Sequence, residues 1–276
     1  PQAGILNAVI FGERGGMTQE ISDQMSKSGI IHLIAISGSH ISLIIIILMY
    51  IAPYFYLSKN SAFYIIAVIV CLYILIIGFP ASAVRSVIMG LLTIFAIKNG
   101  RLANSKNALI FAASVMLLHN PKLLRDDIGF QLSFLSVWGI ITFIPQWEEK
   151  LKNLPDVFKL KQILFITLAS YISTLPLVIF YFGRISFISP LVNLIAVPIF
   201  SILIVITLLA FFIYAIFPSY ALWIFFMPYL ATSYFIGVSS FFSGIPYSSL
   251  QVPRVPFEVI GMLYIFILYY AYYKKI

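Results

Sequence analysis

The chain has 276 residues, of which 62% are hydrophobic and 9% are charged, and its mean hydropathy is +1.04. A soluble domain carries about 25% charged residues, so this composition excludes an ordinary soluble protein and indicates an integral membrane protein. The formal net charge of +8 fits either a nucleic-acid partner or the Lys- and Arg-rich cytoplasmic loops that most bacterial membrane proteins have.

The apolar runs of the chain define the fold class. A backbone in lipid must satisfy its own hydrogen bonds, which restricts spanning elements to helices or a closed barrel. The runs here are uninterrupted and lack the alternation of barrel strands, so we predict an all-α, polytopic transmembrane helix bundle. No long soluble insert separates the runs, and we expect one domain over residues 1–276. The chain starts at Pro1 without a Met or a signal peptide, so we expect a piece of a longer protein.

The first 36 residues are expected to form an interfacial segment ahead of the bundle. Residues 4–12 are apolar but far shorter than the ~20 residues that a span needs. Over residues 17–28, an apolar residue recurs every four positions while charged residues occupy other faces, which predicts an amphipathic helix on the membrane surface that ends at Gly29. The recurring residues are Met17, Ile21 and Met25.

Residues 37–276 are expected to form the membrane bundle, with about eight or nine spans. The sequence offers nine candidate runs, of which all but one are long enough to cross a bilayer, or nearly so. They cover residues 41–57, 62–78, 81–97, 107–118, 128–144, 164–182, 185–217, 220–242 and 257–273. The run over 107–118 is short and is predicted to be either re-entrant or a short tilted span.

The run over residues 185–217 is too long for one straight span. Pro198 removes an amide donor and clashes with the preceding turn, so we predict a broken helix near Asn193 and Pro198, with a half-helix over 190–197 and a full span from Pro198. Broken helices within membranes often mark substrate paths.

Polar residues inside the apolar runs are the first candidates for function, because lipid disfavours them strongly. Arg85 lies about one turn inside the third run, where it either reaches back to the interface or faces an aqueous path and meets a phosphate or a carboxylate. Gln131 is an amide that needs a partner from another helix or from a passing substrate. Asn193 either bonds the carbonyls freed by Pro198 or lines a pore.

Asp127 stands one turn before Gln131 and either caps the helix that begins there or shares a functional face with that amide. Gly129 and Ser133 form a small-residue face that favours helix packing. His32 and His40 flank a helix-breaking Ser-Gly-Ser sequence; a metal site would need a third ligand, and the simpler interpretation is two interfacial histidines with hydrogen-bond roles.

Several other chemistries have no signature here. The single cysteine, Cys71, excludes an intrachain disulfide and a cysteine-based metal site. No Gly-rich phosphate loop with its Lys is present, so the chain does not read as its own ATP motor.

Five motifs, in this order along the chain, together resemble the membrane domain of the ComEC family of competence proteins. They are Gly29 to His40 with its Ser37-Gly38-Ser39-His40 sequence, Arg85-Ser86, Gly100-Arg101, Asp127-Ile128-Gly129-Phe130-Gln131-Leu132-Ser133-Phe134, and Ser173 to Pro198. The resemblance extends from about Gly12 to Leu203. Ser39 and Ser86 depart from the Leu and Ala that are common in that family, which affects fine packing.

The resemblance implies a membrane channel that carries single-stranded DNA across the bacterial cytoplasmic membrane during natural transformation. The DNA path would be lined by Arg85, Gln131, Asn193, Ser82 and Arg101. The mouth and the structural motifs would be formed by His32, Ser37, Gly38, His40, Asp127, Gly129, Ser133 and Pro198. The implied partners are single-stranded DNA, the lipid bilayer, a DNA-receptor protein and a cytoplasmic ATP-dependent motor.

Complete members of that family add an OB-fold module and a metallo-β-lactamase-like domain. This chain has no His-x-His-x-Asp-His signature and no β-rich segment, so we expect no enzymatic activity, no cofactor and no metal in it. Two alternatives remain at this stage. One is an intramembrane metal-dependent hydrolase that uses His32, His40 and Asp127, and the other is a transporter of a small anionic solute, suggested by the broken helix.

Overall fold

The computed structural model describes residues 2–13, 15–152, 160–253 and 255–273. Within these ranges almost every element is a helix, and the exception is one sheet of two short strands. The predicted all-α helix bundle is therefore confirmed.

The first third of the chain forms three short helices followed by three longer ones. The short helices are α1 (Gln2–Phe11), α2 (Gln19–Ser28) and α3 (Ile31–Ile34). The longer ones are α4 (Gly38–Ile51), which continues as the 3-10 turn η1 (Ala52–Phe55), α5 (Lys59–Ile77) and α6 (Ala81–Lys98).

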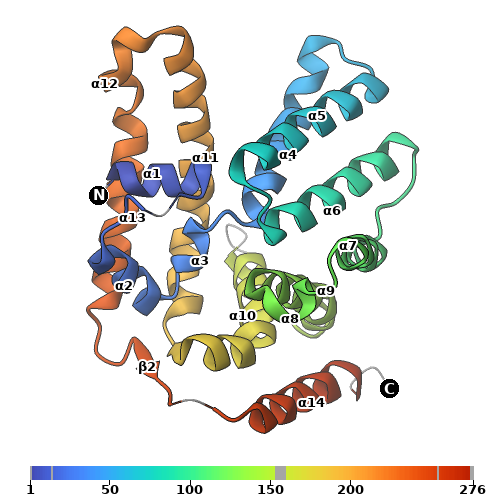
Figure 1. Ribbon diagram of the computed structural model, residues 1–276, viewed down its shortest axis with the longest axis vertical. Helices are drawn as coiled ribbons and strands as arrows, with labels where there is room; N and C mark the ends of the chain where they lie inside the picture. Colours follow the sequence, from blue (N-terminus) through green and yellow to red (C-terminus); the bar gives the residue numbers. More distant parts are fainter. Residues whose placement is uncertain (1, 14, 153–159, 254, 274–276) are drawn as a thin grey trace.

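The helices α4, α5 and α6 form one arm of the molecule, and the elements that follow them form its base and a second arm (Figure 1). The base contains α7 (Ser105–His119), α8 (Leu123–Asp126), α9 (Ile128–Lys150) and α10 (Leu160–Phe182). The arm contains α11 (Ser189–Ile216), η3 (Pro218–Tyr220), α12 (Ala221–Ile224) and α13 (Phe226–Ser243). Strands β1 (Arg184–Ser186) and β2 (Ser249–Gln251) pair antiparallel, and α14 (Phe257–Tyr273) follows.

In the part of the chain that the structure describes, seven helical segments are long and apolar enough to cross a membrane. They are Gly38–Phe55, Lys59–Ile77, Ala81–Lys98, Ile128–Lys150, Leu160–Phe182, Ser189–Ile216 and Pro218–Ser243. Two more of the nine predicted spans, over residues 107–118 and 257–273, coincide with the shorter apolar helices α7 and α14. Their crossing stays a prediction.

The amphipathic helix predicted over residues 17–28 is present as α2. Gly29 ends it in the left-handed conformation, with φ at 78° and its amide bonded to the carbonyl of Ser26. The apolar face of α2 packs against α13, because Ile21 and Met25 are buried in the core that α13 shares. The apolar face that was expected to lie on lipid therefore packs on protein, which offers α2 a denser surface than lipid does.

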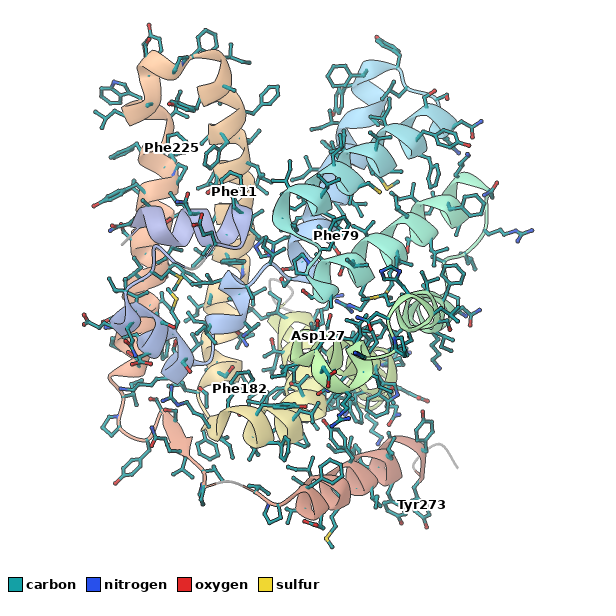
Figure 2. All side chains as sticks on the ribbon, in the orientation of Figure 1. Phe11, Phe79, Asp127, Phe182, Phe225 and Tyr273 are labelled. Atoms are coloured by element: carbon teal, nitrogen blue, oxygen red, sulfur yellow. The ribbon has the colours of Figure 1, made fainter. Side chains whose placement is uncertain are left out.

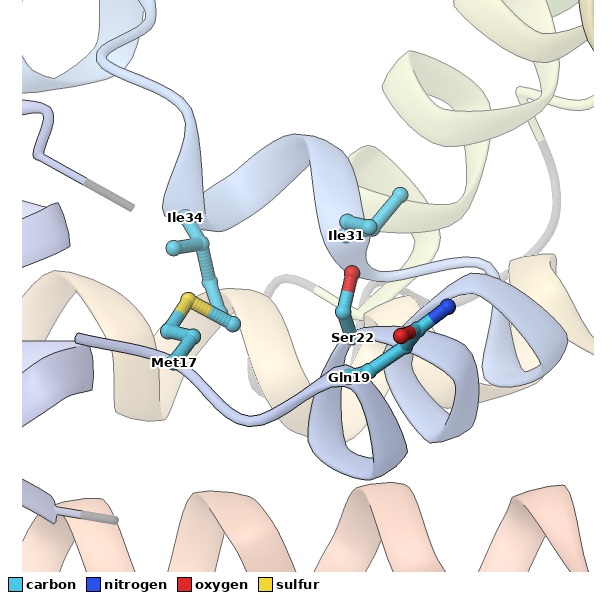
Figure 3. A pocket seen from close by; sticks show the side chains of 5 residues that line it. All are labelled: Met17, Gln19, Ser22, Ile31 and Ile34. Atoms are coloured by element: carbon cyan, nitrogen blue, oxygen red, sulfur yellow. The ribbon is translucent and has the colours of Figure 1, made fainter. Parts of the chain in front are cut away.

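The N-terminal helices share one apolar core with α11 and α13. Buried residues of this core include Ile5, Met25, Ile34, Leu203 and Phe235. A pocket of about 230 Å³ remains between α2, α3 and the segment before α2, as Figure 3 shows. Its lining is Met17, Gln19, Ser22, Ile31 and Ile34.

The helix predicted to break near Asn193 and Pro198 is continuous, so that prediction is wrong. α11 runs for 28 residues with Pro198 inside it. Proline removes one backbone donor, whereas the buried positions of α11 recur every three or four residues on both sides of Pro198. These positions include Val192, Ala196, Phe200, Leu203 and Thr207. Packing along this continuous stripe holds the two halves together as one helix.

A second core lies between α4, α5 and α6. Ile41, Val70 and Val87 are buried in it. The small residues of α6 allow the close approach of α4, since a side chain added at Gly90 would meet Ile45. Ser86 and Gly90, one turn apart on α6, thus form a packing face toward α4.

Five helices close into a ring that joins the two cores. α4 contacts α6, α6 contacts α9, α9 contacts α10, α10 contacts α11, and α11 contacts α4. Figure 1 shows α4 and α6 on one side, α11 on the other, and α9 and α10 below their meeting point. Most of the residues selected from the sequence lie on helices of this ring.

Candidate functional site

The start of α4 is held by its own serine and histidine. The Ser37 amide donates to Nδ1 of His40 at 3.2 Å, and the Ser37 hydroxyl lies 3.1 Å from the same nitrogen. Because Nδ1 accepts the amide, the ring proton is on Nε2. Nε2 is buried without a partner, and the ring meets Phe200 of α11 edge-on, with centroids 5.4 Å apart.

Gly38 is a point of very close approach between α4 and α6. A side chain at this position would overlap the Ser86 hydroxyl and would lie 2.7 Å from Nη2 of Arg85. The preceding loop is tied to the same helix, because the Ser82 hydroxyl donates to the carbonyl of Ile36 at 2.9 Å. The Ser-Gly-Ser sequence is therefore a tight helix crossing as well as a helix start.

Arg85 is buried inside the protein, with 7% of its surface exposed. Nη2 donates to the Ser86 hydroxyl at 3.3 Å, the guanidinium carbon lies 5.9 Å from the centroid of Phe134, and Nε has no partner. Among the described residues the one ion pair joins Arg125 to Asp126, so no carboxylate neutralises Arg85 there. The interpretation in which Arg85 reaches back to the interface is therefore wrong, because α4 and α9 enclose it.

The polar residues at the start of α9 have different environments. Asp127 caps the helix by accepting from the Phe130 amide at 2.7 Å, which matches the structural interpretation of this residue. Figure 2 shows Asp127 where α8 meets α9. The Gln131 amide nitrogen donates to the carbonyls of Leu124 and Arg125, both at 3.0 Å, and fixes α8 on α9.

Two side-chain oxygen atoms of α9 lack a hydrogen-bond partner among the described residues. Oε1 of Gln131 and the hydroxyl of Ser133 are buried without partners. A side chain at Gly129 would lie 3.1 Å from Oδ1 of Asp127, so glycine leaves room for the cap.

Asn193 is buried in the first part of α11, with 5% exposure. Its amide nitrogen makes a long bond of 3.5 Å to the Ser189 hydroxyl, and its Oδ1 has no partner. The bond runs toward the start of the helix, away from the carbonyls that Pro198 frees, so it does not satisfy them.

Two predicted residues lie away from this region. His32 is exposed on α3, with Nδ1 3.0 Å from the carbonyl of Gly29. Arg101 is exposed on the loop after α6 and lines a surface hollow of about 530 Å³ with residues such as Phe95 and Leu102. The structure does not bring either residue to the ring.

The metal-dependent alternative lacks a ligand set in the described part of the chain. No three His, Cys, Asp or Glu side chains gather there. His32, His40 and Asp127 each make a separate local bond on a different element.

One property unites five of the predicted residues. Within the described ranges, the buried side-chain nitrogen and oxygen atoms without a hydrogen-bond partner belong to His40, Arg85, Gln131, Ser133 and Asn193. Native proteins leave few such atoms, and each one calls for a physical reason. We name these five residues the unpaired polar set.

Two aromatic neighbours of the unpaired polar set were not singled out from the sequence. Phe134 lies under Arg85, and Phe200 lies against His40. Phe134 is inside the Asp127 motif, but Phe200 follows Asn193 by two helical turns and only its spacing along α11 marks it.

Residues 9–276 match the protein family described as Competence protein. ComE operon protein 3 of Bacillus subtilis (strain 168) is 27% identical over 199 residues, which make up 72% of this chain and 25% of that protein. The chain thus spans about a quarter of the length of the curated relative that it matches. No solved structure matches the chain.

Proposed function

Because the chain belongs to the competence protein family, we propose that it forms the membrane path by which single-stranded DNA crosses the bacterial cytoplasmic membrane during natural transformation. The unpaired polar set supports this function most directly. Polar groups without partners are expensive inside an apolar bundle, and a polar substrate that passes through would satisfy them.

The surroundings of these groups suit a nucleic acid. Proteins that hold single strands combine positive charge, which follows the phosphates, with aromatic rings, on which bases stack. Arg85 lies beside Phe134, and His40 lies beside Phe200. A path with one buried cation holds phosphate weakly enough for the strand to move on.

The remaining parts of the machinery lie outside this chain in our proposal. The OB-fold and metallo-β-lactamase-like domains of the parent protein would handle the strand chemically, and a DNA-receptor protein would deliver it. A cytoplasmic ATP-dependent motor would drive movement, since the sequence has no Gly-rich phosphate loop. The membrane part itself would act without catalysis.

The rival transporter of small anions has lost its main structural argument. It rested on a broken helix near Asn193, and α11 is continuous there. A transporter would nevertheless use the same buried groups, so the test must detect the strand itself.

Cysteine crosslinking in the full-length parent protein tests the proposal. Cys71 is exposed and is replaced by Ser, and one cysteine is then placed at Ser82, Gln131 or Asn193. We expect crosslinks to DNA stalled in transit from these positions and none from Ile46, which is 61% exposed on the outer side of α4. Continued uptake with no crosslink at any inner position would refute the path.

A further inference from the structure

The positive end of α4 and the guanidinium of Arg85 lie together without a counter-charge. We propose that they form a seat for one phosphate group, built from the amides of Gly38 and Ser39 and the guanidinium of Arg85, which the hydroxyl of Ser86 orients. The identification of its natural ligand as a phosphodiester of the passing strand rests on the function proposed above; the seat itself rests on the contacts described here.

The amides at the start of α4 are available to an anion. α4 has 14 residues, and its aligned peptides place about half a positive charge at its N-terminus. The His40 amide bonds the carbonyl of Ser37 at 3.2 Å. Those of Gly38 and Ser39 donate to no acceptor among the described residues. Ser39 is exposed and Gly38 is half-buried, so the start of α4 is not fully enclosed.

Arg85 supplies the second half of the seat. Nη2 faces Gly38, and Nε is a buried donor with nothing to donate to. The chain has no Asp or Glu between Asp23 and Asp126, so the elements that surround this arginine on α4 and α6 carry no acid. A cation buried without a partner is strongly disfavoured, and the adjacent helix end adds to its positive field. A bound anion would offset both.

Two small residues explain how the seat keeps its shape. A side chain at Gly38 would overlap the Ser86 hydroxyl and crowd Nη2 of Arg85, so glycine lets the helix end come this close to the guanidinium. The Ser86 hydroxyl accepts from Arg85 and donates to the carbonyl of Ser82 at 2.9 Å. Ser86 is therefore a positioning residue that orients the guanidinium.

The donors of the seat suit a phosphate group. Helix N-termini and arginine forks both match tetrahedral oxyanions, and one arginine with two amides suffices for a single phosphate. A strand held at one phosphate would exchange it for the next as it moves. The seat would thus act as a stepping point in the path and not as a continuous basic groove.

Binding of radiolabelled inorganic phosphate to the purified full-length parent protein in detergent tests the seat. We expect the wild type to bind one phosphate more per chain than Arg85→Gln. The matched control is Arg125→Gln, which removes an exposed arginine and should leave the number unchanged. Arg85→Lys keeps the charge but loses the fork, and we expect it to keep the site with about tenfold weaker affinity.

Equal stoichiometry and affinity in all four proteins would overturn the seat, and the crosslinking result would be unaffected by that outcome. Competition experiments distinguish a phosphate of DNA from a phosphate of a lipid headgroup. A thymidine dinucleotide should displace the bound label, whereas short-chain phosphatidylglycerol should not. Displacement by the lipid alone would overturn the assignment to DNA, and a negative crosslinking result would do so independently while the anion site remained.

Discussion

Buried hydroxyls in the core around α1, α2, α11 and α13 are hydrogen-bonded, whereas several buried polar atoms on the helices of the ring have no partner among the described residues. In the core, Thr207 and Thr232 donate to carbonyls of their own helices at 2.6 and 2.7 Å. Ser28 and Ser239 bond each other at 3.2 Å across α2 and α13. In the ring, the unpaired polar set has atoms with no such partner. Burial alone therefore says little about function, and unmet hydrogen-bonding capacity says more.

The same contrast occurs within α9. Gln146 donates to the carbonyls of Thr142 and Ala271, at 3.1 and 3.0 Å, and thereby attaches α14 to the bundle. Gln131 uses its nitrogen in the same structural way, but its Oε1 is left buried and free. One glutamine is satisfied as a structural link, while the other retains an acceptor that a substrate would use.

The largest expected effect comes from removing the buried positive charge of Arg85 from the helix ring. Arg85→Ala in the parent protein should lower DNA uptake by about 10–100-fold, which matches the loss of a charge-assisted hydrogen bond. Transformation frequency measures the effect, with protein abundance checked by immunoblot. Arg125→Ala is the control and should transform normally. Normal uptake in Arg85→Ala would remove this residue from the path.

A glycine pair compares the tight crossing with the open surface. Gly38→Ala should lower the free energy of unfolding by about 1–3 kcal/mol, because a methyl group would overlap Ser86 and Arg85. Gly237→Ala on α13 meets open space and should raise it by about 0.5–1 kcal/mol through helix propensity. Denaturation in detergent measures both, and equal effects would argue against close packing at Gly38.

Asp127 should behave as a structural residue. Asp127→Ala should destabilise the protein by about 0.5–2 kcal/mol, because the Phe130 amide loses its acceptor, whereas Asp127→Asn should retain the cap. Uptake per folded molecule should stay unchanged in both variants. A loss of uptake in a stable Asp127→Asn protein would assign this carboxylate a role beyond capping.

Asn193→Leu is expected to change stability least, and it tests most directly whether an unpaired buried group serves uptake and not folding. Asn193→Leu removes a buried acceptor without a partner and a long 3.5 Å bond, so stability should stay equal or rise by about 1 kcal/mol. Uptake should nevertheless fall. Thr207→Val on the same helix is the control and should preserve uptake. A destabilised Asn193→Leu would show that the amide is a structural group.

Local chemistry was predictable from the sequence. The end of α2 at Gly29 and the cap at Asp127 depend on residues within a few positions; the first occurs as predicted, and the second is one of the two interpretations that the sequence left open. The course of α11 was not predictable in this way. Whether Pro198 breaks a helix depends on how strongly the helix is packed on both sides of the proline, and that packing comes from α13 and the N-terminal helices.

The site shows the same division. The sequence identified each member of the unpaired polar set as a polar residue in an apolar chain, but it left open whether Arg85 reaches outward and whether Asn193 bonds freed carbonyls. Arg101 carries the same charge as Arg85 and belongs, like Arg85, to one of the motifs that resemble the competence family, yet it lies exposed on a loop. Charge and motif alone do not distinguish these two arginines.

By itself, the sequence determined that this protein is a helical membrane bundle, because lipid tolerates few polar residues and no unpaired backbone. It also determined the family and the residues that lipid would penalise. Only the tertiary structure decided which of those residues remain unpaired and that Gly38 meets Arg85. These contacts join helices far apart in the sequence, and hydrogen-bond satisfaction is a property of the assembled neighbours rather than of any one segment.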